Sequence, residues 1–299
     1  MSSAARPASK SGPDGDSAFE ENSGVEKCAF AMNSSQNNLA NGDGRPWLVR
    51  FRPNPSAALR LFCFPYAGVG ASIFSPWVHR LHSKIEMVGV QLPGREGRIR
   101  EEPFDRLSRI VPEAARFIRN DLDRPYAIFG HSLGALIGFE VARCLRREGA
   151  PDPVHLFLSA RRAPPRPDPL PEIHGLPDAE FLEEIQRRWD GIPSAVLREA
   201  ELLQLLLPAL RADVAVLETY THLQGEPLDC PISVFGGEND RNIGREDLLG
   251  WRGHTRGDFR LRLLPGGHFF IRTQQQALLE AMSDDILQAL GRGKESGKC

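Results

Sequence analysis

The sequence predicts an α/β fold with a mostly parallel central sheet flanked by helices. From about residue 46 onward, short apolar runs typical of strands alternate with longer amphipathic stretches typical of helices. Most of the runs are followed within a few positions by Gly, Pro or other small residues that favour a turn. Strands that alternate with helices are expected to pair in parallel, because each helix carries the chain back to the start of the next strand.

Six segments are expected to be strands, because each is a short β-type apolar run: residues 59–64, 85–91, 126–129, 154–159, 232–235 and 259–264. Three segments are expected to be helices. Residues 133–147 end at Gly149, and residues 107–122 have helical spacing that Pro112 must kink or restart. A capping box formed by Thr273 and Gln276 predicts a last helix that Gly291 closes.

The pattern also predicts where the domain begins and ends. Residues 1–45 are rich in Ser, Asn, Gly, Asp and Ala without sustained periodicity, so we expect a disordered N-terminal extension. One domain is expected over residues 46–291, followed by a flexible C-terminal tail at residues 292–299.

One long interval, residues 161–230, contains no convincing strand. It begins with a proline-rich stretch and continues with an amphipathic and then a leucine-rich stretch. We expect a helical insertion at about residues 165–228 that forms a lid over the sheet. The alternative is a purely structural pair of crossover helices.

Composition excludes several classes of protein. The chain has 37 basic and 39 acidic residues, so no general attraction to nucleic acid is implied. Its five cysteines are widely spaced and include no CxxC pair, and neither a metal nor a cofactor is expected. No apolar run approaches the roughly 18 residues of a membrane span, and no secretory signal is evident. We therefore expect a cytoplasmic protein that binds no membrane.

A GxSxG motif follows the strand expected at 126–129 and precedes the helix expected at 133–147. Its residues are Gly130, His131, Ser132, Leu133 and Gly134. A serine at such a strand-to-helix turn has an exposed hydroxyl, and this arrangement is typical of the α/β-hydrolase fold. Ser132 is the expected nucleophile; the alternative is a turn serine that merely caps a helix.

The nucleophile needs a base, and chain order in this fold places the base after the last strand. His268 follows the strand at 259–264, which puts it at the same sheet edge as Ser132. By contrast, His254 precedes that strand, and His131 should point away from its neighbour Ser132. His268 is therefore the expected base.

The acid that orients His268 should lie after the strand at 232–235, where both Glu238 and Asp240 occur. The loop after the preceding strand contains no carboxylate. We expect Asp240, because a short carboxylate at the end of a tight Gly-rich turn is the more easily fixed. Two backbone N–H groups should form the oxyanion hole, that of Leu133 and that of Ala67 in the turn after the first of the six strands.

Several segments together resemble the type II thioesterases that stand alone beside polyketide and nonribosomal peptide synthases. These segments are residues 61–71 (LFCFPYAGVGA), 90–98 (VQLPGREGR), the GHSLG elbow, 208–213 (PALRAD), 237–240 and 266–269. Tyr66 departs from the pattern, since histidine is frequent at that position. The resemblance implies hydrolysis of acyl groups from the phosphopantetheine arm of an acyl or peptidyl carrier protein. We expect the enzyme to be a monomer. Medium-chain fatty acyl thioesterases share the family, and small-ester hydrolases, acyltransferases and noncatalytic binding proteins are competing classes.

Two groups of arginines are expected near the active-site edge, where they could dock an acidic carrier protein. The alternative is that they are ordinary surface charges or pair with Glu96, Glu101 and Glu102. The two groups are Arg95, Arg98 and Arg100, and Arg161, Arg162 and Arg166.

Overall fold

A computed structural model describes residues 47–166, 169–189, 191–192 and 194–296, with the side chains of 194, 195 and 292–296 excepted. All these residues belong to a compact unit, Ser35–Cys299. The extension predicted at residues 1–45 lies outside the described residues, as do residues 297–299.

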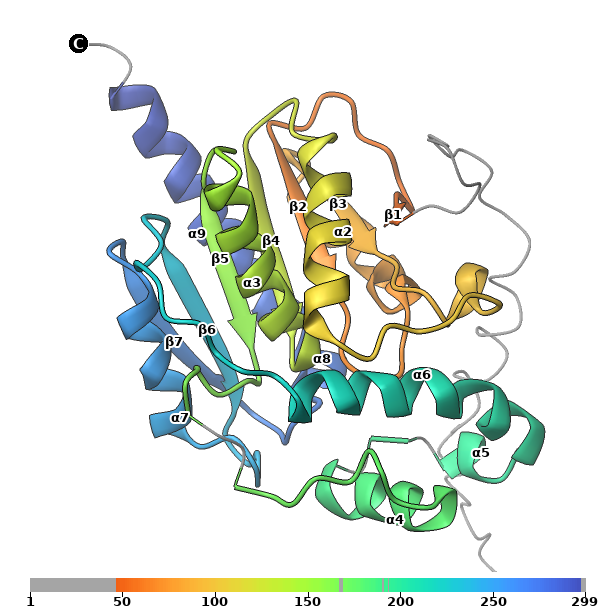
Figure 1. Ribbon diagram of the computed structural model, residues 1–299. Coiled ribbons are helices and arrows are strands. Elements are labelled where there is room, and N and C mark those ends of the chain that lie inside the picture. The colour runs from red at the N-terminus through yellow and green to blue at the C-terminus, as the bar shows by residue number, and fades with distance from the viewer. Residues whose placement is uncertain (1–46, 167–168, 190, 193, 297–299) are drawn as a thin grey trace, which may run out of the picture. The chain divides into compact units, whose positions relative to one another are not determined.

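The described residues form a seven-stranded sheet of order β1-β3-β2-β4-β5-β6-β7 (Figure 1). All neighbouring strands pair in parallel except β1 and β3, which are antiparallel. The six predicted strands are present, and the mostly parallel α/β architecture is confirmed. The strands are β1 (Leu48–Val49), β2 (Leu59–Phe64), β3 (Ile85–Val90), β4 (Tyr126–His131), β5 (His155–Ser159), β6 (Ile232–Gly237) and β7 (Phe259–Leu264).

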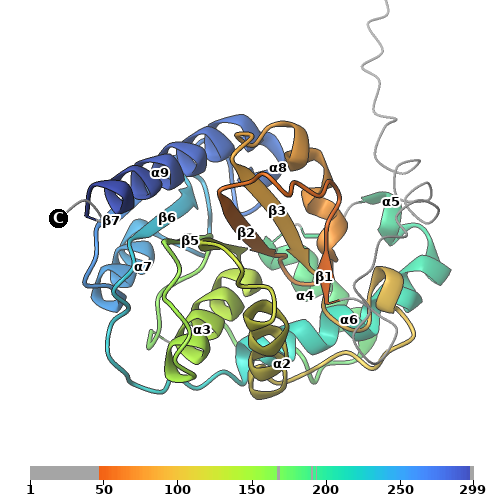
Figure 2. The ribbon, with the colours of Figure 1, turned by 90° about the horizontal axis from the view of Figure 1, so that it is seen from above.

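Helices cover both faces of the sheet, as Figure 2 shows. Helices α2 (Leu107–Arg119) and α3 (Leu133–Arg147) lie on one face, and α9 (Gln275–Ser296) lies on the other. Strand β2 illustrates the division, because Phe62 and Phe64 belong to the core under α2 and α3, whereas Leu61 and Cys63 belong to the core under α9. Alternate residues of a strand point to opposite faces, so β2 presents apolar side chains to both layers of helices.

The remaining elements are short helices and the insertion. They are η1 (Ala71–His79), η2 (Glu96–Arg98), α4 (Asp178–Trp189), α5 (Ser194–Leu197), α6 (Ala200–Glu218), α7 (Arg245–Leu249), η3 (Gly250–His254) and α8 (Phe270–Thr273). Within the described ranges, none of the helices combines the length and apolar content needed to cross a bilayer.

Two helix boundaries differ from prediction. Helix α2 continues through Pro112, because its buried stripe of Ile110, Ala114 and Ile118 keeps it packed on the core. The capping box predicted for the last helix is wrong. The Thr273 hydroxyl donates to the Phe270 carbonyl within α8, and the Gln276 amide donates to Glu280 within α9.

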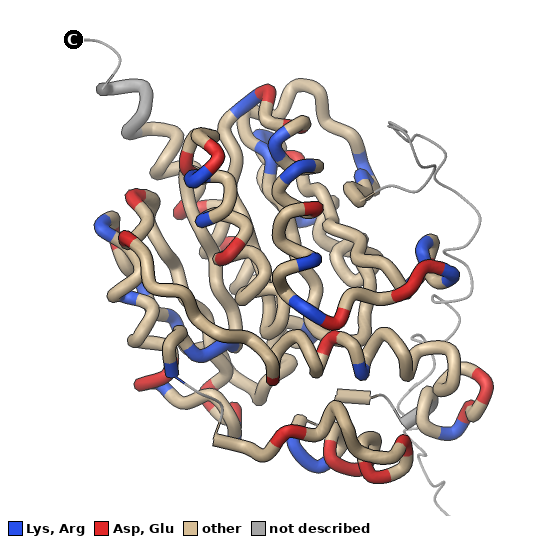
Figure 3. Tube along the Cα trace, in the orientation of Figure 1, with Lys and Arg blue, Asp and Glu red and all other residues tan. Residues whose placement is uncertain are grey.

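The insertion between β5 and β6 is helical in its described part, with α4, α5 and α6 and no strand. Helix α6 passes across the carboxyl ends of the strands, and α4 lies beyond it (Figure 1). A small core of the insertion contains Phe181 and Ile185 of α4 and Val214 of α6. Charged positions are sparse along α6 and dense along α4 (Figure 3), which is consistent with α6 being packed between two layers.

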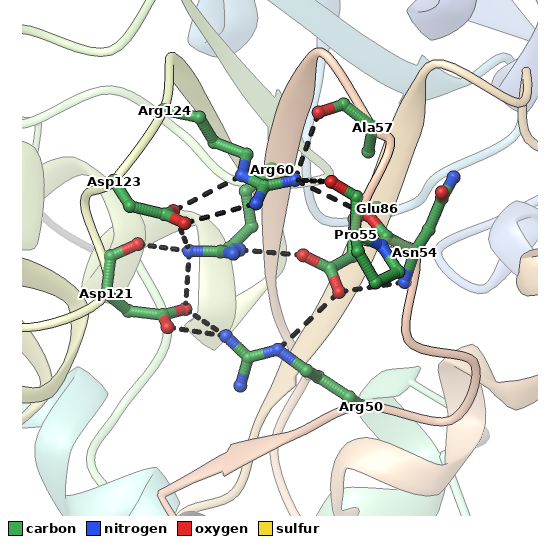
Figure 4. A network of polar contacts seen from close by, with 9 residues as sticks. All are labelled: Arg50, Asn54, Pro55, Ala57, Arg60, Glu86, Asp121, Asp123 and Arg124. Carbon is green, nitrogen blue, oxygen red and sulfur yellow. Dashed lines mark hydrogen bonds and ion pairs between the residues drawn. The ribbon is translucent and has the colours of Figure 1, made fainter.

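Ion pairs fasten the opposite, amino edge of the sheet (Figure 4). Arg60 of β2 is buried and donates to Glu86 of β3 at 2.9 Å and to Asp123, before β4, at 2.8 Å. Asp121 pairs with both Arg50 and Arg60. This network ties the starts of three strands together and lies at the end of the sheet away from Ser132.

Candidate active site

Ser132 lies at a strained turn between β4 and α3. Its backbone dihedrals are φ 54° and ψ −114°, which a residue with a side chain rarely adopts. The flanking glycines allow the turn, since a Cβ on Gly130 would lie 2.0 Å from the Gly134 carbonyl oxygen. A Cβ on Gly134 would lie 2.2 Å from the Phe64 carbonyl oxygen. The two glycines of GxSxG are therefore needed because the backbones of β4, α3 and β2 are in close contact here.

The structure brings Ser132, His268 and Asp240 into one hydrogen-bonded chain. His268 Nε2 is 3.0 Å from Ser132 Oγ, and His268 Nδ1 is 2.8 Å from Asp240 Oδ2. Only 8% of the His268 side chain and 1% of the Asp240 side chain are exposed. Parallel strands β4, β6 and β7 end at the same edge, which explains how residues up to 136 positions apart meet.

Asp240 is held on both carboxylate oxygens. While Oδ2 faces His268, Oδ1 accepts the backbone N–H of Asn242 at 3.0 Å and that of Ile243 at 3.2 Å. Glu238, the alternative acid, is exposed. Sequence reasoning missed the two amides; a carboxylate followed two residues later by a turn is the signal that points to them.

His131 supports the site from below. It is fully buried, its Nδ1 is 2.9 Å from Ser159 Oγ, and its ring packs on those of His268 and Tyr66. Burial, with the nearby His268, holds the pKa of His131 well below its usual value. His131 is therefore a neutral packing residue, and it helps to fix the ring of His268.

The two residues predicted to supply oxyanion N–H groups border the same space. Leu133 is the first residue of α3, so the helix offers no acceptor for its amide. Ala67 and Ser132 line one cavity. The turn that holds Ala67 is fixed on both sides, because Arg272 donates to the Tyr66 hydroxyl at 3.0 and 3.1 Å, and the Gly68 N–H donates to Asp213 at 2.7 Å.

The cavity above Ser132 has a volume of about 90 Å³. The insertion supplies much of its apolar wall. The lining residues from α4, α6 and the segment between α4 and α5 include Ile185, Trp189, Ile192, Leu210, Val214 and Leu217. This arrangement can hold an apolar group against a serine hydroxyl that is hydrogen-bonded to an imidazole.

Several of the arginines predicted to dock a carrier are structural instead. Arg95 is 2% exposed and pairs with Asp213, and Arg98 is 6% exposed and pairs with Glu101. Arg162 is also buried and donates to the Asn242 carbonyl. Arg166 is exposed and pairs with Asp247, and Arg100 is exposed. The docking prediction is therefore wrong for Arg95, Arg98 and Arg162, because a buried guanidinium that is bonded to a carboxylate or carbonyl is part of the fold.

A second set of Ser, His and Asp lies at the amino half of the sheet. His155 Nε2 is 2.9 Å from Ser233 Oγ, and the Ser233 hydroxyl donates to Asp285 Oδ2 at 2.6 Å. Asp285 is also paired with Arg260 and Arg262. Burial lowers the pKa of His155 to about 4.

Comparison with known proteins identifies the family. The model of the thioesterase domain family matches residues 59–286, which is most of the chain. The chain belongs to the thioesterase family. Membership confirms the predictions of an α/β-hydrolase fold and of a thioester hydrolase.

Individual thioesterases support this assignment. The chain is 44% identical over 240 residues to the gramicidin S biosynthesis protein GrsT of Aneurinibacillus migulanus, covering 80% of this chain and 93% of GrsT. It superimposes with a TM-score of 0.73 on RedJ, a thioesterase of the prodiginine pathway of Streptomyces coelicolor, at 38% identity and with 83% and 96% coverage. Identity to the human medium-chain S-acyl fatty acid synthase thioesterase is 31% over 226 residues, with 73% and 83% coverage.

Proposed function

We propose that this thioesterase is a type II editing enzyme, which removes acyl groups from the phosphopantetheine arm of carrier proteins in a polyketide or nonribosomal peptide synthase. The observation that carries the proposal is the hydrogen-bonded chain from Asp240 through His268 to Ser132, beneath an apolar cavity walled by the insertion. The relatives named above support a role in a biosynthetic pathway, since GrsT is a gramicidin S biosynthesis protein and RedJ is a thioesterase of the prodiginine pathway.

In the proposed reaction, Ser132 is the nucleophile and His268 is the general base. His268 Nε2 takes the hydroxyl proton as Oγ attacks the thioester carbonyl, and Asp240 stabilises the imidazolium that forms. The N–H groups of Leu133 and Ala67 face the oxyanion. The C–S bond then breaks; a thiol with a pKa of about 8.5 is a good leaving group, and His268 returns the proton to it. Water, deprotonated by His268, hydrolyses the acyl-Ser132 ester and restores the enzyme.

The insertion has a proposed role as the lid that holds the acyl group. Leu210, Val214 and Leu217 of α6 face the cavity that contains Ser132. The phosphopantetheine arm would enter with its carrier protein outside the lid. We further propose that the enzyme acts as a monomer in the cytoplasm.

A second candidate function is the hydrolysis of medium-chain fatty acyl groups, which the likeness to the human enzyme favours. The higher identity to GrsT favours the editing role. The two functions differ in the acyl groups that they would remove and in the carriers that would present them.

The test is a comparison of kcat/KM for five kinds of substrate: short-chain and medium-chain acyl groups on a synthase carrier protein, the same two acyl groups on coenzyme A, and nitrophenyl esters. The editing function predicts the highest kcat/KM for short acyl groups on the carrier. Preference for medium chains would assign the enzyme to fatty acid metabolism. Preference for nitrophenyl esters over both thioesters would contradict the proposed substrate class.

A further inference from the structure

A buried carboxylate of the lid is bonded directly to the turn that holds Ala67. Asp213 of α6 has no exposed surface, and its Oδ2 accepts the Gly68 N–H at 2.7 Å. Gly68 follows Ala67 and has φ +79°. The lid helix also packs on this glycine, because a Cβ there would lie 2.9 Å from Leu210 Cδ1. The turn and α6 are thus joined by one hydrogen bond and one close packing contact.

Arg95 completes the connection. Its guanidinium binds both oxygens of Asp213, with Nη1 at 2.5 Å from Oδ2 and Nη2 at 3.0 Å from Oδ1. The Gln91 side chain makes a second connection between the two segments. It accepts the Ala71 N–H, just after the turn, at 2.8 Å and donates to the Arg95 carbonyl at 3.1 Å. Asp213 therefore lies where the lid, the Arg95 segment and the turn meet.

Because Asp213 is buried, its bonds to Gly68 and Arg95 depend closely on the position of α6. A carboxylate removed from water is stabilised only while its bonds are kept, and losing one partner of a buried ion pair is costly. If α6 is displaced, Asp213 must leave Gly68 or Arg95, or carry the turn with it. The same helix supplies Leu210, Val214 and Leu217 to the cavity. Acyl-group contact with α6 and the position of the turn are therefore mechanically linked.

We propose that Asp213 is a positioning residue for catalysis, which holds the Ala67 N–H in place for the oxyanion only when the lid helix is seated. The proposal rests on the proposed roles of Ser132 and Ala67. It assigns to the PALRAD and VQLPGREGR segments one shared task, since each contributes one partner of the Asp213–Arg95 pair. Arg95 acts through Asp213 and is not among the residues that line the cavity around Ser132.

The test uses Asp213→Asn, which keeps the shape of the side chain and removes its charge. A single amide oxygen cannot serve Gly68 and both Arg95 nitrogens. A displaced oxyanion donor lowers turnover about 10- to 100-fold. We expect that loss in kcat on a small nitrophenyl ester, with KM changed less than about threefold. Affinity for an alkyl boronic acid, whose tetrahedral adduct with Ser132 places an oxygen in the same hole, should fall by a similar factor.

The matched control is Asp178→Asn, the same substitution at a carboxylate that pairs with Arg211 of the same lid helix. Asp178 has no described hydrogen bond or ion pair with the turn that holds Ala67. Neither kcat nor boronic acid affinity should therefore change. All rates are normalised to sites counted with a fluorophosphonate. If Asp213→Asn does not fold, Arg95→Lys replaces it, because Lys keeps the charge but loses the two-bond geometry.

Two results would overturn the proposal. One is a lower melting temperature with unchanged kcat and boronic acid affinity, which would make Asp213 only an anchor of the lid. The other is a raised KM with unchanged kcat, which would place its effect in the shape of the pocket. Because these readouts are ratios to the wild type on a simple ester, they hold even if the carrier-protein substrate class is wrong.

Discussion

Two clusters of serine, histidine and aspartate lie at opposite ends of the parallel strands. They differ in the order in which hydrogen bonds connect the three residues. In the cluster at the carboxyl ends, His268 lies between Ser132 and Asp240. In the cluster near the amino ends, the serine lies in the middle, since the Ser233 hydroxyl is bonded to both His155 and Asp285. A histidine can take a proton from a serine and share the resulting charge with an acid only in the first order.

The two carboxylates also differ in their other partners. Asp240 is bonded to two backbone amides and to His268, so the imidazole is its only ionisable partner among the contacts described. Asp285 is bound by Arg260 and Arg262, and the positive charges of these arginines already balance its negative charge. Serine, histidine and aspartate in proximity therefore do not make a catalytic site; the order of their bonds and the charge of the acid's other partners do.

The largest expected effect is at Ser132, the proposed nucleophile. Ser132→Ala should lower kcat on a thioester by about 10⁴-fold or more, because it removes the group that His268 activates. Ser233→Ala is the matched control and should keep kcat within about twofold of the wild type. Steady-state kinetics and thermal unfolding of both variants would show this. Residual activity of a tenth or more in Ser132→Ala would contradict the comparison.

The next effect concerns the acid. Asp240→Asn should lower kcat by about 10⁴-fold, since an amide at this position favours the wrong tautomer of His268. Glu238→Gln, in the same loop but exposed, should change kcat only a few-fold. Measured kcat values for the two variants rank the acids directly, and the reverse ranking would move the acid role to Glu238.

The cluster of His155, Ser233 and Asp285 is expected to make the free energy of unfolding depend on pH. The pKa of His155 is lowered from its usual 6.5 to about 4, so folding favours the neutral ring. Its stabilising contribution is complete above pH 6.5 and is lost as the pH falls toward 4, by up to about 3 kcal/mol. His155→Gln cannot bind that proton, so its free energy of unfolding should fall less over this range. Urea titrations at both pH values measure this; equal losses in the two proteins would contradict the expectation.

The smallest effect sharpens the same contrast. Ser233→Ala removes the hydroxyl between two buried polar groups and should cost about 1 to 3 kcal/mol of unfolding free energy at pH 7. Ser132→Ala removes a partly exposed hydroxyl at a strained turn and should cost less. Urea unfolding of the two variants gives the ranking. A larger loss for Ser132→Ala would mean that Ser132 also has a structural role.

The local sequence pattern was enough to predict six of the strands and the turn that contains Ser132. Apolar runs predicted six strands, and the glycines around Ser132 predicted a strand-to-helix turn because only glycine fits there. Strand β1 was missed, since two residues carry no periodicity. The capping box at Thr273 failed because the chain forms another short helix, α8, before α9 begins.

Long-range polar contacts were beyond the sequence pattern. Arg95 and Asp213 are 118 positions apart, and nothing near either residue indicates a buried partner. An arginine in a Gly-rich loop looks the same whether it is solvated or folded against a carboxylate. Chain order in a parallel sheet brought Ser132 and His268 together in the prediction, because it specifies which loops share an edge. No such rule relates helix α6 of the insertion to the turn beside it.

The central claim is that Ser132 forms the covalent intermediate, and trapping that intermediate tests it most directly. The enzyme would be quenched in acid during turnover of an acyl thioester, digested, and searched by mass spectrometry for acylated peptides. The account predicts an acyl adduct on the peptide that contains Ser132, absent from Ser132→Ala and absent from the peptide that contains Ser233. An adduct on any other residue that forms and decays at the rate of turnover would contradict it.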